Sequence, residues 1–463
     1  MLCRVLHCHM ELLGFVLSLV TISGLVDGET TSSFGPTRHT TKGRIRGLRV
    51  NVHGTDVDMY LGIPYAKPPI GNLRFRHPLP ADHWPDVKNT TQKPNACEQA
   101  IDTVFTNHSG PSVWNANTPL SEDCLYLNVW EPRTKSDGYS YEKHVMVWIF
   151  GGGFFSGSSS LDIYDGRYLA AENDVIVVSM QYRVGALGFL SLFHPEAPGN
   201  AGLFDQVLAL DWVQQNIHFF GGNPHSVTLF GESAGAASVG MHMLSPLSRG
   251  KFHRVILQSG APHAAWAILP EKDAKNRSLK LAEKLGCNIK SEVADVINCL
   301  RTKTANEIYS TEWDGIVPYG VVRFPIVPVV DGAFLTETPE KALKYGHIKK
   351  CPVLLGHNLH EANYWMLYYN QVVFPIDEQP RISQAQFDKV LDDFFFFHPH
   401  HPIQLSPIGK EAITFQYRHW LNPDDQVQNA KQLDHAVGDY NFICPTVDFA
   451  MKAASLGNEV VFT

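Results

Sequence analysis

The residues most clearly suited to chemistry are Gly231-Glu232-Ser233-Ala234-Gly235, which follow the strand-like segment HSVTLF and open a small-residue segment of helical period, AGAASVGMHML. A serine between two glycines at a strand-to-helix turn is typical of a nucleophile elbow. Only small residues fit at the two glycine positions, because larger side chains would collide with the adjacent strand and helix. We therefore predict that Ser233 is a nucleophile.

A serine nucleophile also needs a base, an acid that orients the base, and donors for the oxyanion of the tetrahedral intermediate. The segment VMVWIF runs directly into Gly151-Gly152-Gly153-Phe154, whose N–H groups could converge on one oxygen. The N–H group of Ala234 would add a further donor. A flexible glycine turn is the alternative, but three glycines between two apolar blocks favour an oxyanion hole.

These residues must be positioned by a sheet with helices packed on it, because segments rich in β-branched and aromatic residues alternate with segments of helical period. The sequence predicts an α/β fold with a large, mixed and mostly parallel sheet. The expected buried strands cover residues 145–150, 175–180, 226–230, 254–257 and 352–355, and the expected helices cover 202–215 and 279–285.

Composition narrows the classes of protein that remain. The chain has 463 residues, of which 44% are apolar and 11% aromatic, enough for a large core and incompatible with collagen, a coiled coil or a disordered chain. The formal charge of −8 arises from 46 acidic against 38 basic residues spread along the chain, without a basic run that could follow a phosphate backbone. We therefore expect no nucleic-acid partner.

The N-terminal residues 1–28 have the pattern of a secretory signal peptide. Arg4 and His7 precede a mostly apolar stretch from Leu12 to Val26, and small or compact residues follow. The stretch is short for a membrane span, which needs about 20 apolar residues. A cleaved signal is favoured over a retained anchor.

Three acceptor sequons, at Asn89, Asn107 and Asn276, are consistent with a glycosylated, exported protein. Each sequon alone is weak evidence, because such triplets occur by chance. We expect the mature chain to be secreted or held at the extracellular face of the plasma membrane, as at a synapse.

The cysteines fit an oxidising compartment. Cys97 with Cys124, and Cys287 with Cys299, would each close a short loop, so we predict two disulfides. Cys351 lies in the strand-like CPVLLG and is expected to be a buried small hydrophobe.

Metal and cofactor chemistry is not predicted. His398, His400 and His401 lie in the low-complexity segment FFFFHPHHP, but no carboxylate or cysteine completes a plausible coordination shell there. We interpret that segment as a solvated loop and expect no cofactor.

Four longer motifs identify a family. The chain resembles the type B carboxylesterases, and within them the cholinesterases, at EDCLYLNVW (122–130), WIFGGGFFSGSSS (148–160), YRVGALGFL (182–190) and FGESAGAAS (230–238). The likeness extends from about Gly43 to Phe449. It implies an α/β-hydrolase fold over residues 35–463, with an aromatic-lined gorge that ends at the serine.

The resemblance assigns catalytic roles to individual residues. It implies Ser233 as the nucleophile, Glu361 as the acid of the triad, and Gly152, Gly153 and Ala234 as the oxyanion donors. Glu361 lies in LLGHNLHEANYW, directly after an expected strand. Without the resemblance, Glu361 would be interpreted as an ordinary surface carboxylate.

The resemblance also implies a binding site for a small cationic ester, since a quaternary ammonium group is best held against aromatic faces. Trp114 matches the tryptophan of the family's choline site and lies in the loop between Cys97 and Cys124. The other residues that match cation-site or gorge positions are Asp102, Tyr164, Glu232, Tyr364 and, at the mouth, Trp313.

The acyl side departs from the acetylcholine-selective pattern of the family. Phe324 matches one phenylalanine of a tight acyl pocket and Trp266 its opposite wall, but Val322 replaces a second phenylalanine. Replacing an aromatic ring by valine opens volume, so larger acyl groups such as butyryl are expected to fit. Phe155 and Trp365 are further departures, which should affect inhibitor contacts more than chemistry.

The C-terminal segment leaves two classes of function open. Family members carry their catalytic histidine in a segment beyond the position of Thr463, together with the partner of a cysteine that Cys444 matches. The context of His435, KQLDHAVGDY, does not resemble the family's histidine motif, and GNEVVFT is expected to be a strand. We therefore expect a truncated chain.

That chain would be either an inactive fragment of a choline-ester hydrolase or, alternatively, a catalytically silent adhesion or binding ectodomain. A general carboxylesterase is a further alternative. Oligomer formation or an anchoring subunit would act through the tail that follows in the family.

Overall fold

The computed structural model describes residues 33–133, 142–317, 321–393 and 405–463. The N-terminal 28 residues and the histidines at 398, 400 and 401 lie outside these ranges. No helix of the described ranges is both long enough and apolar enough to cross a bilayer.

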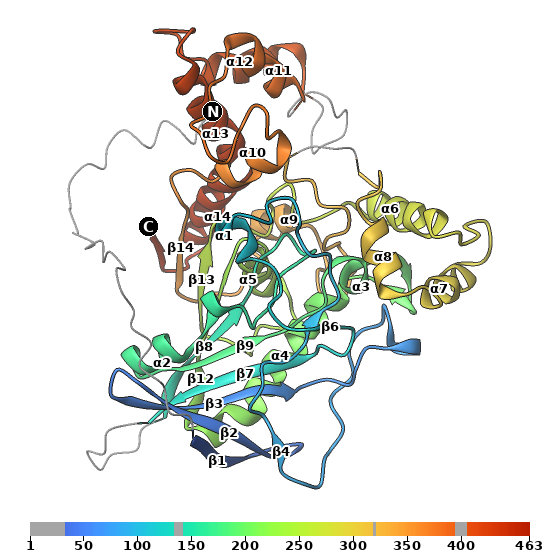
Figure 1. Cartoon of the computed structure of the whole chain (residues 1–463), viewed down its shortest axis with the longest axis vertical. Helices are drawn as coiled ribbons and strands as arrows, with labels where there is room; N and C mark the ends of the chain where they lie inside the picture. Colours follow the sequence, from blue (N-terminus) through green and yellow to red (C-terminus); the bar gives the residue numbers. More distant parts are fainter. Residues whose placement is uncertain (1–32, 134–141, 318–320, 394–404) are drawn as a thin grey trace.

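A large twisted sheet forms the centre of the molecule, with its strands in the order β1-β2-β3-β7-β9-β8-β12-β13-β14-β15 and β4 beside β2 (Figure 1). The strands of this sheet are β1 (Ser33–Thr40), β2 (Gly43–Val52), β3 (Thr55–Pro64), β4 (Lys88–Asn89), β7 (Tyr126–Pro132), β8 (Lys143–Ile149), β9 (Ile176–Met180), β12 (Gly222–Glu232), β13 (Arg254–Gln258), β14 (Val353–Gly356) and β15 (Val460–Phe462). Two small sheets contain β5 (Ala96–Cys97) with β6 (Leu120–Ser121) and β10 (Ser191–His194) with β11 (Ala197–Pro198).

The sheet is mixed. The pairs on one side are antiparallel: β1-β2, β2-β3, β3-β7 and β7-β9. The pairs that follow are parallel: β9-β8, β8-β12, β12-β13, β13-β14 and β14-β15. The strands near the middle are buried on both faces, which explains their nearly continuous runs of Val, Ile and Leu. All five predicted buried strands are present, and the C-terminal segment forms β15, so the predicted fold class is confirmed.

Helices cover the sheet and gather beyond its β14 end (Figure 1). They are α1 (Ser109–Ser112), α2 (Arg167–Asn173), α3 (Gly185–Phe189), α4 (Ala201–Asn216), α5 (Ala234–Leu244), α6 (Glu271–Lys284), α7 (Val293–Arg301), α8 (Ala305–Thr311), α9 (Pro339–Tyr345), α10 (Asn363–Tyr369), α11 (Gln384–Leu391), α12 (Pro407–Tyr417), α13 (Gln426–Gly438) and α14 (Cys444–Ser455). Helix α5 packs on β12, β13 and β8. A π-helical segment, Asp439–Ile443, joins α13 to α14.

Helix α6 is longer than predicted. The sequence indicated a helix from residue 279, whereas α6 begins at Glu271. Its first turns, EKDAKNR, are mostly charged, so they show little apolar periodicity. Acidic residues in the first turn, Glu271 and Asp273, favour this helix start through the helix dipole.

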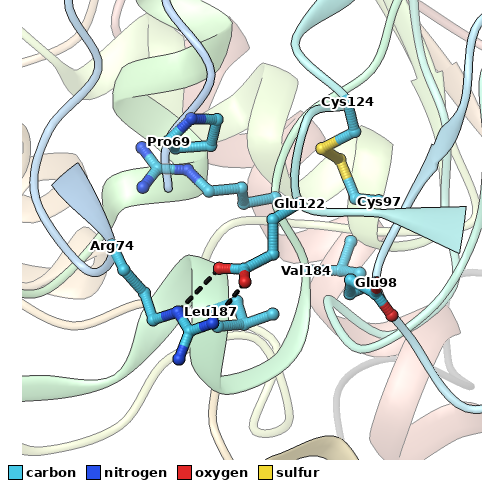
Figure 2. A pocket seen from close by; sticks show the side chains of 9 residues that line it. Pro69, Arg74, Cys97, Glu98, Glu122, Cys124, Val184 and Leu187 are labelled. Carbon is cyan, nitrogen blue, oxygen red and sulfur yellow. Dashed lines mark hydrogen bonds and ion pairs between the residues drawn. A yellow bond between two sulfur atoms is a disulfide. The ribbon is translucent and has the colours of Figure 1, made fainter. Parts of the chain in front are cut away.

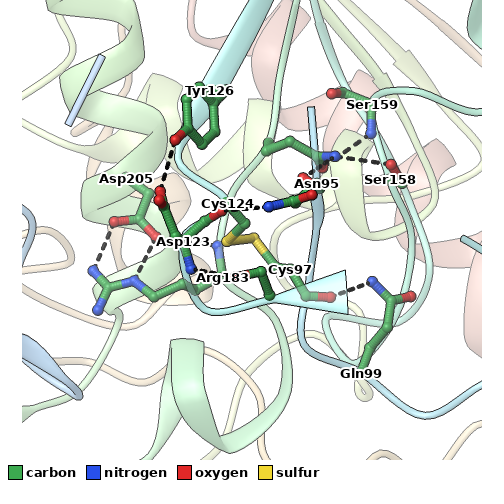
Figure 3. Close-up of a disulfide and its surroundings, with 12 residues drawn as sticks. Asn95, Cys97, Gln99, Asp123, Cys124, Tyr126, Ser158, Ser159, Arg183 and Asp205 are labelled. Carbon is green, nitrogen blue, oxygen red and sulfur yellow. Dashed lines mark hydrogen bonds and ion pairs between the residues drawn. A yellow bond between two sulfur atoms is a disulfide. The ribbon is translucent and has the colours of Figure 1, made fainter. Parts of the chain in front are cut away.

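Two ion pairs that are largely shielded from solvent connect separate segments of the chain. Arg74 pairs with Glu122 beside a cavity of about 10 Å³, which also borders the Cys97–Cys124 disulfide and has room for about one water molecule (Figure 2). Arg183 donates to both carboxylate oxygens of Asp205, at 2.8 and 2.7 Å (Figure 3). Removing one member of such a pair would leave an uncompensated buried charge.

Both predicted disulfides are present, Cys97–Cys124 and Cys287–Cys299. The first closes the loop that contains Asp102 and Trp114. Cys351 is buried, as predicted for a small hydrophobe.

Candidate active site

Ser233 lies at the junction of β12 and α5, in the strand-to-helix turn that the sequence predicted. Its backbone has φ 56° and ψ −119°, a conformation that non-glycine residues rarely adopt. The Ser233 N–H donates to the carbonyl oxygen of Gln258 on β13 at 2.8 Å, which holds the turn in place. The residue is 9% exposed. Such local strain persists only where the surrounding structure holds it, and it is often found at functional sites.

The two glycines of the motif are required by close backbone contacts. A Cβ atom at Gly235 would lie 2.0 Å from the carbonyl oxygen of Ile149, and one at Gly231 would lie 2.6 Å from the backbone of Gly235. Helix α5 therefore starts in direct contact with β8 and β12. This contact fixes Ser233 at the C-terminal end of the parallel strands.

The glycine run after β8 lies against the serine. A Cβ atom at Gly151 would lie 3.1 Å from the Cβ of Ser233, and Gly152 and Gly153 have φ values of 106° and 60°. The carbonyl oxygen of Gly152 accepts hydrogen bonds from Phe155 and Ser156, so it points into the turn. Within the described residues, the N–H groups of Gly152, Gly153 and Ala234 donate no recorded hydrogen bond. They are available to an oxyanion.

Glu361 lies in the loop between β14 and α10. Its Oε1 accepts a hydrogen bond from the N–H of Asn358 at 2.7 Å, and the Asn358 side chain contacts the hydroxyl of Ser259 at 3.5 Å. The Ser259 N–H in turn donates to Gly356 at the end of β14. These contacts connect Glu361 to the edge of the sheet that bears Ser233.

Glu232, next to the serine, is electrostatically coupled to Glu361. Burial, together with the nearby Glu361 carboxylate, raises the pKa of Glu232 to about 7. At neutral pH, the Glu232 carboxyl is therefore close to the midpoint of its titration. A cation bound nearby would favour its ionised form.

The residues predicted for a cation site lie in two groups of side chains. The ring centroid of Trp114 lies 6.4 Å from that of Tyr164, which lies 5.0 Å from Trp148 on β8. Trp114 is 41% exposed, so part of its ring is open to a ligand.

The second group is a chain of hydroxyls from α10. The Tyr368 hydroxyl donates to the Asp102 carboxylate and lies 3.3 Å from the Tyr364 hydroxyl. Asp102 is thereby tied to α10, across the opening of the disulfide loop.

The residues predicted for the acyl side also lie together. Phe324 packs edge-on against Trp266, with ring centroids 5.9 Å apart, and a Cβ atom at Gly153 would lie 2.9 Å from the Phe324 ring. Val322 is buried at 4% exposure, with φ 53°. Trp313, expected at the mouth, is half exposed, and its ring centroid lies 4.9 Å from that of Phe155.

Sequence reasoning missed three residues of this site: Trp148, Asn358 and Tyr368. Tyr368 follows Tyr364 by one helical turn on α10, and that i,i+4 spacing is the signal that could have identified it. Trp148 has no such local signal, because its role depends on contacts with distant segments. Asn358 lies only three residues before Glu361, but its contact there uses a backbone N–H, which gives no residue-type signal.

Within the described residues, no hydrogen bond joins the Ser233 hydroxyl to a histidine. His360 directly precedes Glu361, but its Nδ1 lies 2.6 Å from Asp434. The ring of His435 lies nearly parallel to that of His360.

A mixed, mostly parallel sheet with a strained serine at a strand-to-helix elbow and free backbone donors beside it defines a serine hydrolase of the α/β type. The chain belongs to the Carboxylesterase family, whose sequence profile matches residues 35–463.

Similar proteins include a cholinesterase from Mus musculus, 47% identical over 91% of this chain and 68% of that protein. An acetylcholinesterase from Electrophorus electricus is 47% identical over 89% of the chain and 64% of its own length. An acetylcholinesterase from Bungarus fasciatus is 45% identical over 91% of this chain and 68% of its own length. The chain thus spans about two thirds of the length of these relatives.

The elbow contact gives a first prediction. Gly235→Ala should lower the free energy of unfolding by about 1–3 kcal/mol, because the new methyl group overlaps the carbonyl of Ile149. Thermal unfolding of the purified protein measures this change. Gly250→Ala is the control, since nothing lies within 4 Å of its Cβ position. An increase in stability from Gly235→Ala, the usual effect of alanine in a helix, would contradict the described elbow.

Proposed function

We propose that this protein hydrolyses choline esters through an acyl-enzyme on Ser233. The observation that carries the proposal is the placement of Ser233 at a strained elbow, with the glycine run beside it. Trp114 of the disulfide loop, next to Tyr164, adds an aromatic surface. The names of its relatives support the same substrate class, since they are cholinesterases and acetylcholinesterases.

In the proposed reaction, the Ser233 hydroxyl attacks the ester carbonyl while an imidazole accepts its proton. The carbonyl oxygen becomes an oxyanion, which accepts hydrogen bonds from the N–H groups of Gly152, Gly153 and Ala234. The intermediate collapses, the imidazolium returns the proton to the leaving choline oxygen, and the acyl group stays on Ser233. A water molecule then attacks the acyl-enzyme in the same way and releases the acid. Glu361 orients the imidazole.

The cation of the substrate would lie against Trp114, with Glu232 and Asp102 as the nearby acidic groups. Aromatic faces attract quaternary ammonium groups, which cannot donate hydrogen bonds. Because the pKa of Glu232 is about 7, cation binding should favour release of its proton. The acidic, aromatic opening would also raise the association rate of a cationic ester.

Export to the cell exterior is part of the proposal. The asparagines of all three sequons are exposed, at positions where glycans can be attached, and both disulfides suit an oxidising compartment. Secretion or attachment at the extracellular, synaptic face stays a prediction, as does an oligomer or anchoring partner.

Removing the cation-site ring tests the substrate class. In protein that contains the proposed catalytic histidine, Trp114→Ala should raise the KM for acetylthiocholine about tenfold or more, because only a cationic substrate uses the ring. The KM for a neutral aryl ester should change much less. Steady-state assays with both substrates measure the difference, and equal losses on both would contradict the choline-site assignment.

Acyl specificity gives another prediction. Because valine is smaller than the phenylalanine of the family pattern, Val322 should leave space in the acyl pocket. Butyrylthiocholine should therefore be hydrolysed within about tenfold of the rate for acetylthiocholine by protein that contains the proposed catalytic histidine. Val322→Phe should lower kcat/KM for the butyryl ester and leave the acetyl ester nearly unchanged. The assay compares kcat/KM for both esters, and complete rejection of the butyryl ester by the unaltered protein would show that the pocket is already filled.

A catalytically silent binding protein is the second candidate, because the Ser233 hydroxyl has no hydrogen-bonded base within the described residues. Our proposal assigns that base to the histidine that the family resemblance places beyond the position of Thr463. The 463-residue chain expressed alone should therefore hydrolyse acetylthiocholine about four orders of magnitude more slowly than the mouse cholinesterase.

The matched control is Ser233→Ala in the same chain, which should share this low residual rate. Turnover by the 463-residue chain at a rate comparable to the mouse protein would contradict the assignment. A histidine within the chain, such as His435, would then be the base.

A further inference from the structure

We infer that His360, Asp434 and His435 form a binding site for a divalent transition-metal ion. One potential ligand atom from each side chain lies within 4.8 Å of the other two. His360 comes from the loop between β14 and α10, whereas Asp434 and His435 are neighbours on α13. The inference does not depend on the proposed esterase activity.

Asp434 is already oriented as a ligand. Its side chain is 4% exposed, and its Oδ1 accepts a hydrogen bond from the Ala362 N–H at 3.0 Å. The other oxygen, Oδ2, faces the imidazole of His360, with 2.6 Å between Oδ2 and Nδ1. A backbone donor that fixes one carboxylate oxygen while the other binds a metal is a common outer-shell arrangement.

The two imidazoles are close to the separation that a shared ion requires. Their ring centroids are 6.2 Å apart and their planes differ by 15°. Two imidazoles on one tetrahedral ion have centroids about 5 Å apart, given metal–nitrogen distances of about 2.0–2.1 Å. An inward shift of about 1 Å by His360 supplies the difference.

That shift is sterically accessible, because the His360 side chain is 44% exposed. The same exposure leaves room for a water molecule as the fourth ligand. Binding through His360 Nδ1 requires the tautomer that carries its proton on Nε2, so the ion replaces the His360–Asp434 hydrogen bond.

The ligand set selects the class of ion. Two imidazoles and one carboxylate suit Zn²⁺, Cu²⁺, Ni²⁺ or Co²⁺, whereas Ca²⁺ and Mg²⁺ prefer shells of oxygen ligands. An ion at this site would connect α13 to the loop that contains Glu361. It would therefore stabilise the folded chain, by an amount that grows with the logarithm of the ion concentration above the Kd.

Calorimetric titration of the metal-free 463-residue chain with Zn²⁺ tests the site. The background variant carries His398→Gln, His400→Gln and His401→Gln, which removes three other imidazoles. We expect one Zn²⁺ per chain, a higher thermal midpoint with Zn²⁺, and no heat from Ca²⁺ or Mg²⁺. His360→Gln and His435→Gln should each raise the Kd at least tenfold and abolish the thermal shift.

His53→Gln is the matched control, because His53 also pairs with a carboxylate, Glu172, at 2.7 Å, but without a second histidine. It should leave the Kd unchanged. With Cu²⁺ bound, the electron paramagnetic resonance spectrum of the background variant should show coupling to two imidazole nitrogens. The spectrum of His360→Gln should show coupling to one.

Absence of Zn²⁺ binding by the background variant, or an unchanged Kd in His360→Gln, would overturn the inference. The His360→Gln variant still tests the inference if His435→Gln fails to fold, because the His360 side chain is 44% exposed and its replacement should not unfold the protein.

Discussion

The architecture of the site depends on one backbone contact, the approach of α5 to the end of β8. A Cβ atom at Gly235 would lie 2.0 Å from the Ile149 carbonyl oxygen, so the helix can start there only because position 235 has no side chain. Ser233, at the start of this helix, has φ 56°, and the glycine run after β8 lies beside it. The nucleophile and its proposed oxyanion donors are therefore fixed by the sheet itself, before any substrate binds, which is what electrostatic preorganisation requires.

Around this rigid centre, loops from distant parts of the chain supply charge and aromatic surface. The Cys97–Cys124 disulfide closes the loop that contains Trp114 and Asp102, and the Tyr368 hydroxyl binds Asp102 from α10. Burial keeps the pKa of Glu232 near 7, so its charge responds to a cation placed nearby. In our proposal, the rigid sheet supports the chemistry, whereas the cross-linked loops select the ester.

Features encoded locally were predictable from the sequence: the buried strands, the elbow glycines and both disulfides. Features that depend on tertiary contacts were not. Tyr368 meets Asp102 across 266 residues, and His360 meets Asp434 across 74. The sequence drew attention to the clustered histidines at 398–401, yet the inferred metal site uses two histidines that lie far apart in the chain. Family resemblance gave Glu361 its role, because nothing in its local sequence distinguishes it from a surface carboxylate.

The central claim, that Ser233 carries the acyl group, is tested most directly by trapping the intermediate. Protein expressed from the complete reading frame is mixed with butyrylthiocholine, quenched in acid within the first turnovers, digested and analysed by mass spectrometry. The account predicts a butyryl group on the peptide that contains Gly231 to Gly235, located on Ser233. Butyryl on a different residue, or steady turnover without an acylated Ser233 peptide, would contradict it.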